Sequence, residues 1–420
     1  MAATQAGVLR VLRNPRFRRL WLGQVVSAIG DYFYLLAVPI LVNALTGSIA
    51  AMGLVMVVGF ALPQLLFGIP AGVLVDRWER RRVMVAADLL RAGLVLGGLV
   101  VRDGQTLWVL YVVGFLVSAA SRFFYPAQSA LIPVLVSEDE LLAANGLSQL
   151  TTTASFLVGP ALAGFAIAWL GAGAAFVVDS ASFVVSALAI WSIGEVAPPL
   201  ARATSSSLLV ALGRFWSDVR HGLQEMFGNA TLRGILLSLS ILQLGVGAVN
   251  VLWVPLLARR YGVGPDGLGL VDSMQGAGMA VGAVTVAWLS ARVAKVRIVS
   301  AGLAVLGLML ALTGVAPSLA FILAYTFVLG LALSPVQAAL ATLAQGTAPE
   351  HLRGRVFGTM GTLGQVASLV SMGAAAGAAE WVGIPTVYGA CGVLVALSGV
   401  VFEAFVREPK ALEAQVRDGV

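Results

Sequence analysis

The chain has 420 residues, of which 59% are hydrophobic and only 11% are charged, and its mean hydropathy is +0.94. Soluble domains carry about a quarter charged residues, so this composition excludes a soluble globular protein and indicates an integral membrane protein. The net charge of +6 does not indicate nucleic-acid binding, because the basic residues lie between apolar segments and form no stripe.

Apolar segments long enough to cross a bilayer, which takes about 20 residues, recur along the whole chain. A helix satisfies its own backbone hydrogen bonds in lipid, and no segment alternates in the manner of a barrel strand, so we expect an all-α membrane protein. The twelve expected helices cover about residues 20–45, 50–75, 83–101, 106–133, 144–170, 174–194, 233–258, 267–291, 297–316, 318–343, 355–380 and 384–405.

The connections between the expected helices alternate between rich and poor in arginine and lysine. These residues crowd the N-terminus, 77–82, 202–233, 292–297, 353–355 and the C-terminus, whereas the intervening connections hold only Arg102, Arg259 and Arg260. Because cytoplasmic loops carry the excess of positive charge, this pattern predicts twelve crossings of a bacterial inner membrane, with both termini in the cytoplasm.

A polar connection divides the chain into two six-helix halves. We expect an N-terminal half over 1–194, a cytosolic linker over 195–230 and a C-terminal half over 231–420. The linker contains an amphipathic piece around 208–226, which we expect to lie at the cytosolic membrane surface, with partner binding as the alternative.

The two halves repeat a short pattern. Tyr125-Pro126-Ala127-Gln128-Ser129-Ala130-Leu131 lies in the fourth expected helix, and Ser334-Pro335-Val336-Gln337-Ala338-Ala339-Leu340 lies in the tenth. Similarity at half-chain spacing in a membrane protein indicates a secondary transporter whose site lies near the bilayer midplane, between the repeats.

The stretch from Gly72 to Arg82 interrupts the apolar sequence with a cluster of arginines and two acids. Arginines at an inner helix end are typical of topology signals, but an acid among them is not required for topology. A carboxylate such as Asp76, placed against the N-terminus of another helix, stabilises that contact by about 0.3 to 2 kcal/mol. We therefore interpret this stretch as a gate.

The stretch resembles the signature between helices 2 and 3 of the major facilitator superfamily, G-x-L-x-D-R-x-G-R-R, with Glu79 in place of the second glycine. The whole chain resembles the exporters of that superfamily that include macrolide-efflux and enterobactin-export proteins. The resemblance implies the major facilitator fold and an inner gate that docks on the start of helix 11. The gating residues it implies are Gly72, Asp76, Arg77, Arg80 and Arg81, with gate support from Arg353 and Arg355. Asp88 and Arg91 on the next expected helix are further candidates for gate support.

An ionisable residue near the bilayer centre costs about 2.5 to 3.5 kcal/mol on insertion scales, so each one requires a reason. Asp31 lies about eleven residues into the first expected helix, near the midplane. It is either a coupling or substrate residue or half of a structural ion pair with Arg122, which alternatively resembles the helix 4 arginine of proton-coupled exporters. The expected cavity set is Asp31, Arg122, Tyr34, Gln128, Asn250 and Gln337.

Other polar and small residues favour structural roles. Asp88 and Arg91 are three residues apart and can neutralise each other on one helix face. Asp179, Asp272 and Glu380 lie near membrane interfaces or on helices expected to be peripheral, and for them we expect hydrogen bonding or solvation. Gly159, Pro160 and Gly164 resemble the glycine-proline motif of antiporters in helix 5, and small residues there let helices approach closely. The amides of Gln128 and Gln337 can contact substrate or neighbouring helices.

No enzyme signature, metal-ligand cluster or nucleotide cradle is present in the sequence. We therefore expect a non-enzymatic, monomeric transporter without cofactor or metal, which exports an amphipathic small molecule such as a drug or siderophore by alternating access. With no nucleotide site, protons are the expected coupling ion. Uptake or facilitated diffusion of a metabolite or lipid is the alternative within transport, and a non-transporting membrane sensor or scaffold is the alternative outside it.

Overall fold

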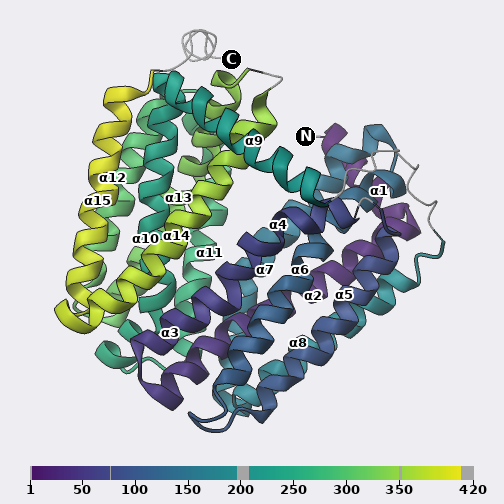
Figure 1. The fold of residues 1–420 in the computed structure, drawn as a ribbon, viewed down its shortest axis with the longest axis horizontal. Coiled ribbons are helices and arrows are strands. Elements are labelled where there is room, and N and C mark those ends of the chain that lie inside the picture. Colours follow the sequence, from purple (N-terminus) through teal and green to yellow (C-terminus); the bar gives the residue numbers. More distant parts are fainter. Residues whose placement is uncertain (1, 76, 196–207, 350–351, 408–420) are drawn as a thin grey trace. The chain divides into compact units, whose positions relative to one another are not determined.

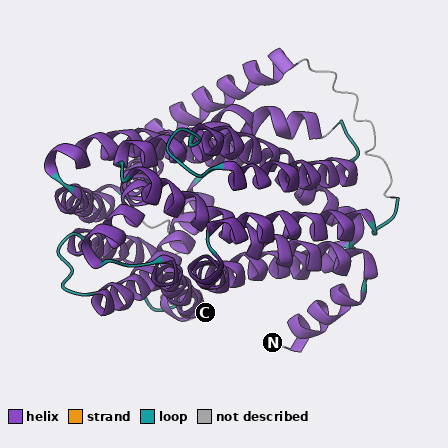
Figure 2. Cartoon of the chain, turned by 90° about the horizontal axis from the view of Figure 1, so that it is seen from below, coloured by secondary structure: helices purple, strands orange, loops and turns teal. Residues whose placement is uncertain are grey.

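The computed structural model describes residues 2–75, 77–195, 208–349 and 352–407. Within these ranges every regular element is a helix, and loops connect the helices without any strand (Figure 2). This confirms the all-α class that the composition predicts.

The chain forms two compact units. The N-terminal unit comprises Met1–Gly47, Val57–Leu212 and Gly264–Gly269. Its helices run side by side in purple and blue (Figure 1). They are α1 (Ala2–Arg13), α2 (Pro15–Thr46), the π-helix η1 (Val57–Ala61), α4 (Leu62–Val75), α5 (Arg80–Val95), the 3-10 helix η2 (Leu96–Val100), α6 (Trp108–Leu135), the 3-10 turn η3 (Glu138–Glu140), α7 (Leu141–Leu170) and α8 (Ala172–Trp191).

The C-terminal unit comprises Ser48–Met56, Gly213–Val263 and Leu270–Val420. Within it α10 packs against α14 and α15, and α12 packs against α13 and α15. Its helices are α3 (Ile49–Met56), α10 (Ala230–Tyr261), most of α11 (Pro265–Ser290), α12 (Lys295–Thr313), α13 (Leu319–Thr347), α14 (Arg353–Val382), α15 (Ile384–Phe405) and, from Gly213 onward, α9 (Leu208–Gly228).

The described helices account for the expected membrane spans. Eleven are long and apolar enough to cross a bilayer, with α3, η1 and the start of α4 counting together as Ile49–Gly68. The segment expected over 267–291 is α11, a helix of 26 residues that contains Asp272. With α11 the described chain therefore has the twelve segments of the sequence prediction, and it is a multi-pass membrane protein.

The first helix of each half begins and ends in the same way. Both α2 and α10 have 32 residues. Asn14 and Asn229 cap their N-termini by accepting hydrogen bonds from backbone N–H groups of the first turn. Gly47 and Gly262 end them in the left-handed conformation, with φ of 57° and 62°, which favours glycine. The caps extend the repeat seen in the sequence.

The fifth helix of each half shows a second correspondence. Both α7 and α14 have 30 residues, and they end at Gly171 and Gly383, each with φ of 82°. The next helix follows directly in both cases, as α8 and as α15. Equivalent turns at equivalent places support two copies of one six-helix design.

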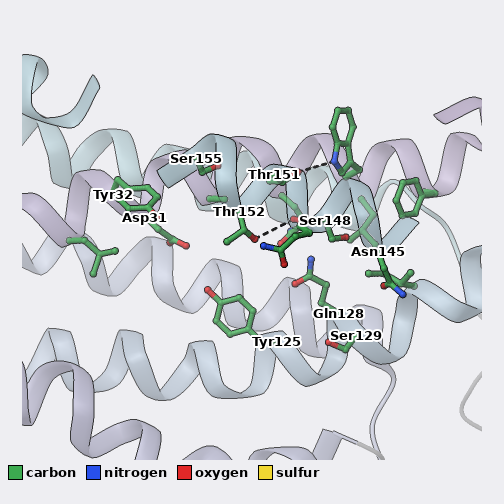
Figure 3. Close-up of a pocket in the computed structure, with 18 residues that line it drawn as sticks. Asp31, Tyr32, Tyr125, Gln128, Ser129, Asn145, Ser148, Thr151, Thr152 and Ser155 are labelled. Carbon is green, nitrogen blue, oxygen red and sulfur yellow. Dashed lines mark hydrogen bonds between the residues drawn. The ribbon is translucent and has the colours of Figure 1, made fainter. Parts of the chain in front are cut away.

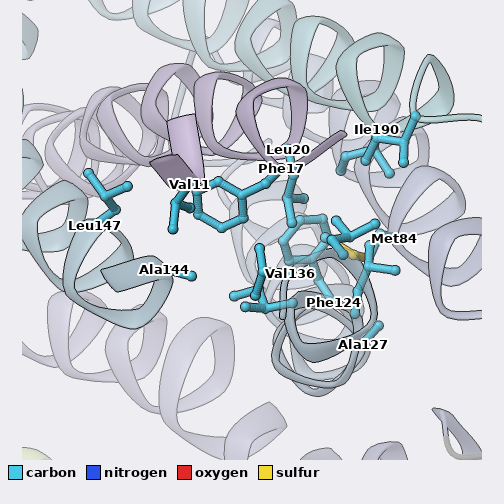
Figure 4. Close-up of a cluster of buried hydrophobic side chains, with 14 of the residues drawn as sticks. Val11, Phe17, Leu20, Met84, Phe124, Ala127, Val136, Ala144, Leu147 and Ile190 are labelled. Carbon is cyan, nitrogen blue, oxygen red and sulfur yellow. The ribbon is translucent and has the colours of Figure 1, made fainter. Parts of the chain in front are cut away.

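A hydrophobic cluster joins the helix ends of the N-terminal unit that the charge pattern assigns to the cytoplasm (Figure 4). Phe17 lies in the first turn of α2, Met84 in the second turn of α5 and Phe124 on α6, and each is at most 1% exposed. Burying a side chain of this size stabilises the folded state by about 1.5 to 3 kcal/mol relative to leaving it exposed to water. The cluster therefore holds these ends of α2, α5 and α6 in fixed register.

The structure adds a helix that the sequence analysis did not predict, because residues 1–19 read only as a basic lead segment. Helix α1 places Val11 in the hydrophobic cluster with no exposed surface. Arg10 forms ion pairs with Asp139 at 3.1 Å and Glu140 at 3.2 Å. The residues that join α1 to η3 are far apart in the sequence, so a local sequence pattern does not predict their contacts.

The amphipathic linker piece is the helix α9, as predicted. Beyond Gly213 it touches α14, where a side-chain carbon at Gly222 would lie 3.1 Å from the Arg355 carbonyl oxygen. Met226 in the last turn is fully buried. One face of α9 thus packs on protein, while its location at the membrane surface stays a prediction.

Candidate functional site: a polar cavity in the N-terminal unit

A cavity of about 590 Å³ lies among α2, α6 and α7, all within the N-terminal unit (Figure 3). Most of its lining side chains are hydroxyls, amides or aromatic rings, which suits a ligand that has both polar and apolar surface. The lining residues are Phe17, Leu20, Trp21, Gln24, Ala28, Asp31, Tyr32, Leu35, Tyr125, Gln128, Ser129, Ile132, Asn145, Ser148, Gln149, Thr151, Thr152 and Ser155.

Asp31 is the one charged residue among those lining this cavity. Helix α2 carries it near its middle, and its carboxylate points into the same space as the Tyr125 hydroxyl of α6 (Figure 3). Gln128 lines the same space one turn further along α6. Of the residues that the sequence predicted for a cavity, Asp31 and Gln128 therefore lie together.

A polar stripe on α7 forms the opposite wall, and the sequence analysis missed it. Its residues Asn145, Ser148, Gln149, Thr152 and Ser155 all line the cavity. They recur at spacings of three and four, which place side chains on one helix face. This spacing of polar residues is the feature of the sequence that could have predicted the stripe.

Trp21 fixes the α2 wall against α7. Its indole Nε1 donates a hydrogen bond to Thr151 Oγ1 at 2.9 Å, and Thr151 itself donates to the Leu147 carbonyl at 3.0 Å. The lining of this wall is thus held by buried hydrogen bonds before any ligand arrives, which favours a preformed site.

A buried ionic cluster lies behind the Asp31 wall. Asp88 and Arg91 of α5 form the ion pair that their spacing predicts, and they are 0% and 2% exposed. The Arg91 guanidinium carbon lies 4.4 Å from the ring centroid of Phe124 and 4.3 Å from that of Phe183. Aromatic faces at this distance stabilise a guanidinium by cation–π attraction.

An ion pair of Asp31 with Arg122, one of the two alternatives for Asp31, is not found among the described residues. The cation whose charge acts on Asp31 is Arg91. The Arg122 guanidinium instead lies 5.8 Å from the ring centroid of Tyr125, on the next turn of its own helix. Arg122 also does not line the cavity. Sequence reasoning chose it because it lay on a helix expected to line the cavity, whereas side-chain direction decided the contact.

Three further residues that the sequence predicted for the cavity do not line it. Tyr34 is 4% exposed and packs its ring against Phe60 and Phe176, so it belongs to the interior of the unit. Asn250 on α10 and Gln337 on α13 lie in the C-terminal unit and are not among the lining residues of this cavity. Their contact with substrate stays a prediction.

Of the two roles expected for Asp179, the structure shows hydrogen bonding and not solvation. Asp179 is 1% exposed in the middle of α8, and the Ser182 hydroxyl lies 3.5 Å from its Oδ1. Asp272 does make the expected hydrogen bond, since Trp253 Nε1 donates to its Oδ1 at 2.8 Å. Glu380 is exposed, in agreement with solvation.

The glycine-proline stretch of α7 has the packing role that small residues predict. A side-chain carbon at Gly159 would lie 2.5 Å from the ring of Tyr32, and one at Gly164 would collide with the carbonyl oxygen of Pro265. The absence of side chains at these two positions lets neighbouring segments approach α7, and Pro160 between them is buried.

The gating stretch is described in part, because Asp76 lies outside the described residues. Glu79, the departure from the superfamily signature, forms ion pairs with Arg81 at 3.4 Å and with Arg82. Arg81 also donates to the Trp191 carbonyl at 3.1 Å, so it links the start of α5 to the end of α8. A cation at a helix C-terminus is stabilising.

The remaining gating residues have separate settings. Gly72 lies in α4, Arg77 is exposed in the turn after it, and the Nε of Arg80 is buried without a hydrogen-bond partner. At the start of α14, Arg353 donates to the Gln345 carbonyl at 3.2 Å. The gating role of Asp76 and the supporting roles of Arg353 and Arg355 stay predictions.

The fold and the cavity together define a class, that of membrane transporters with a polar site between helices. Comparison with known proteins places the chain within it: residues 6–417 match the model of the transmembrane secretion effector family. The chain belongs to this family of major facilitator transporters, which are not enzymes. Among described residues, no group of three or more His, Cys, Asp or Glu could hold a metal ion.

Individual relatives are distant but match over nearly the full length. The uncharacterized MFS-type transporter YfiS of Bacillus subtilis is 29% identical over 411 residues, covering 93% of this chain and 94% of the relative. Macrolide efflux protein A of Streptococcus pyogenes is 27% identical over 377 residues, covering 88% and 90%. A bacterial homologue of the iron transporter ferroportin, solved in its inward-facing state, has a TM-score of 0.70 at 18% identity, covering 94% and 99%.

Proposed function

We propose that this transporter exports an amphipathic small molecule across the bacterial inner membrane in exchange for protons, by alternating access and with both termini in the cytoplasm. The observation that carries the proposal is Asp31, a carboxylate within a span that faces a polar cavity. Carboxylates inside a membrane mark proton or substrate pathways, because their burial costs free energy that a structural role alone does not require.

The direction of transport is supported by the family and by a relative named for macrolide efflux. Export against a gradient requires an energy source. The proton gradient supplies about 2.3 kcal/mol for each charge that crosses 100 mV. A carboxylate that alternately holds a proton and releases it is the simplest way to use that source.

The test uses the full chain in proteoliposomes, with a macrolide such as erythromycin as the probe and an imposed pH gradient. We expect wild-type protein to accumulate the macrolide, and Asp31→Asn to abolish accumulation while leaving exchange of labelled for unlabelled macrolide intact. Asp103→Asn, which changes an exposed loop carboxylate, is the matched control. If macrolide accumulates in the vesicles at the same rate after the pH gradient has been collapsed, proton coupling is contradicted.

A further inference from the structure

Three carboxylates of the N-terminal unit interact electrostatically with a single guanidinium. They are Asp31 of α2, Asp88 of α5 and Asp179 of α8, and the guanidinium is that of Arg91. Asp88 and Arg91 neutralise each other as an ion pair. Among the described residues, no second cation acts on Asp31 or Asp179.

Arg91 forms its ion pair with Asp88 and not with Asp179, although its charge also acts on Asp179. The rings of Phe124 and Phe183 cover its guanidinium, one terminal nitrogen binds Asp88, and the other lies 3.5 Å from Ser121 Oγ. A buried carboxylate without a matching cation is costly in a low-dielectric interior, and such a group binds a proton instead.

Close packing of α8 on α2 brings Asp179 beside Gly30, the residue that precedes Asp31. A side-chain carbon added at Gly30 would lie 3.2 Å from Asp179 Oδ1 and would collide with the Ser182 hydroxyl. That hydroxyl donates to the Asp179 carbonyl oxygen at 2.8 Å and lies 3.5 Å from Oδ1. Glycine at position 30 is thus what allows the two carboxyls to lie on adjoining helix surfaces.

The charged and titratable groups around Asp179 come from two of the four elements packed against α8. Helix α2 supplies Asp31 and Tyr34, and α5 supplies Asp88 and Arg91. The other two elements, α7 and η2, contain no titratable residue. One guanidinium thus faces three carboxylates, and the charge of Asp31 acts on Asp179.

We propose that Asp31 and Asp179 relay the coupling proton between them, with Asp179 as its buried station and Asp31 as its exit to the cavity. This inference rests on the proposed proton coupling. In the transfer step the O–H bond at Asp179 breaks as the O–H bond at Asp31 forms, and the negative charge moves from Asp31 to Asp179. The pair keeps one proton throughout, so the step changes where the charge lies and not its amount.

Infrared spectroscopy of the full chain in lipid vesicles tests the buried proton without any substrate. We expect wild-type protein at neutral pH to show the carbonyl band of a protonated carboxylic acid, which Asp179→Asn removes. Ser182→Ala should displace this band, because its hydroxyl lies beside the carboxyl, and that variant keeps the charge pattern should Asp179→Asn fold poorly. Asp103→Asn should leave the band unchanged. A band that survives Asp179→Asn, or that Ser182→Ala does not move, overturns the proposal.

A transport measurement separates a relay from a purely structural proton. In the proteoliposome assay with erythromycin, Asp179→Asn should lose accumulation driven by the pH gradient. In vesicles loaded with unlabelled erythromycin, the same variant should retain exchange of labelled for unlabelled macrolide. Unchanged accumulation would overturn the relay, and so would equal loss of both activities in a correctly folded variant. If no protein, wild type included, moves the macrolide, the proposed export of this substrate fails, whereas the infrared band still decides whether Asp179 holds a proton.

Discussion

The interiors of the two units differ in how they handle polar groups, although their helices repeat one design. In the N-terminal unit Asp31 lines a cavity and interacts electrostatically with the buried residues Arg91 and Asp179, and Arg91 pairs with Asp88. Among described residues of the C-terminal unit, the carboxylate within a span and away from helix ends is Asp272, which accepts a hydrogen bond from Trp253. A repeat can thus keep its helix ends and caps while its chemistry diverges.

Helix geometry and helix chemistry are therefore constrained separately in this protein. The left-handed Gly47 and Gly262 serve the same turn in both units. Charged residues, by contrast, are retained only where they have a use, because each one within the bilayer costs free energy. We therefore expect the coupling function to reside in the N-terminal unit, and three predictions test this comparison.

The largest expected effect comes from Arg91→Met. Removing one partner of a buried ion pair leaves Asp88 uncompensated, which destabilises by about 3 to 5 kcal/mol. Thermal unfolding in detergent should show a marked drop in melting temperature. Arg122→Met is the matched control, because Arg122 has no ion pair among the described residues, and its drop should be smaller. Equal melting temperatures for the two variants would show that the Asp88–Arg91 ion pair does not stabilise the N-terminal unit, and would contradict this difference between the units.

A moderate effect is expected from Gln149→Leu on the α7 stripe. Losing one hydrogen bond to a ligand costs about 1 kcal/mol, or roughly fivefold in affinity. Trp21 lines the same cavity, so quenching of its fluorescence by added erythromycin can report binding. The control is Thr153→Val, a change on α7 outside the lining residues. Matching affinities for both variants would contradict a role for the stripe in binding.

The smallest effect is expected from Asp272→Asn. The amide oxygen of asparagine can still accept the hydrogen bond from Trp253, so transport driven by the pH gradient should change by no more than about twofold. The measurement is the vesicle accumulation assay, with Asp31→Asn as the sensitive reference. If Asp272→Asn abolishes accumulation as Asp31→Asn does, the division of chemistry between the two units is wrong.

Part of the candidate site could be predicted from the sequence. Asp31 and Gln128 were chosen because a polar residue within an apolar helix is conspicuous, and both line the cavity. The ion pair of Asp88 and Arg91 followed from their spacing on one helix. The partner of Asp31 and the burial of Asp179 could not be predicted, since both depend on which helix faces of α2, α5 and α8 meet.

The all-α membrane class, the number of spans and the internal repeat follow from the sequence alone. These depend on hydrophobic length, on backbone hydrogen bonding and on local caps, all of which act within a segment. Three further features emerge only from the packing of the helices: α7 supplies a cavity wall, Arg81 donates to the Trp191 carbonyl, and Asp179 lies beside Gly30. Those contacts require close approach of helices distant in sequence, and the direction of each side chain depends on packing that no single segment specifies.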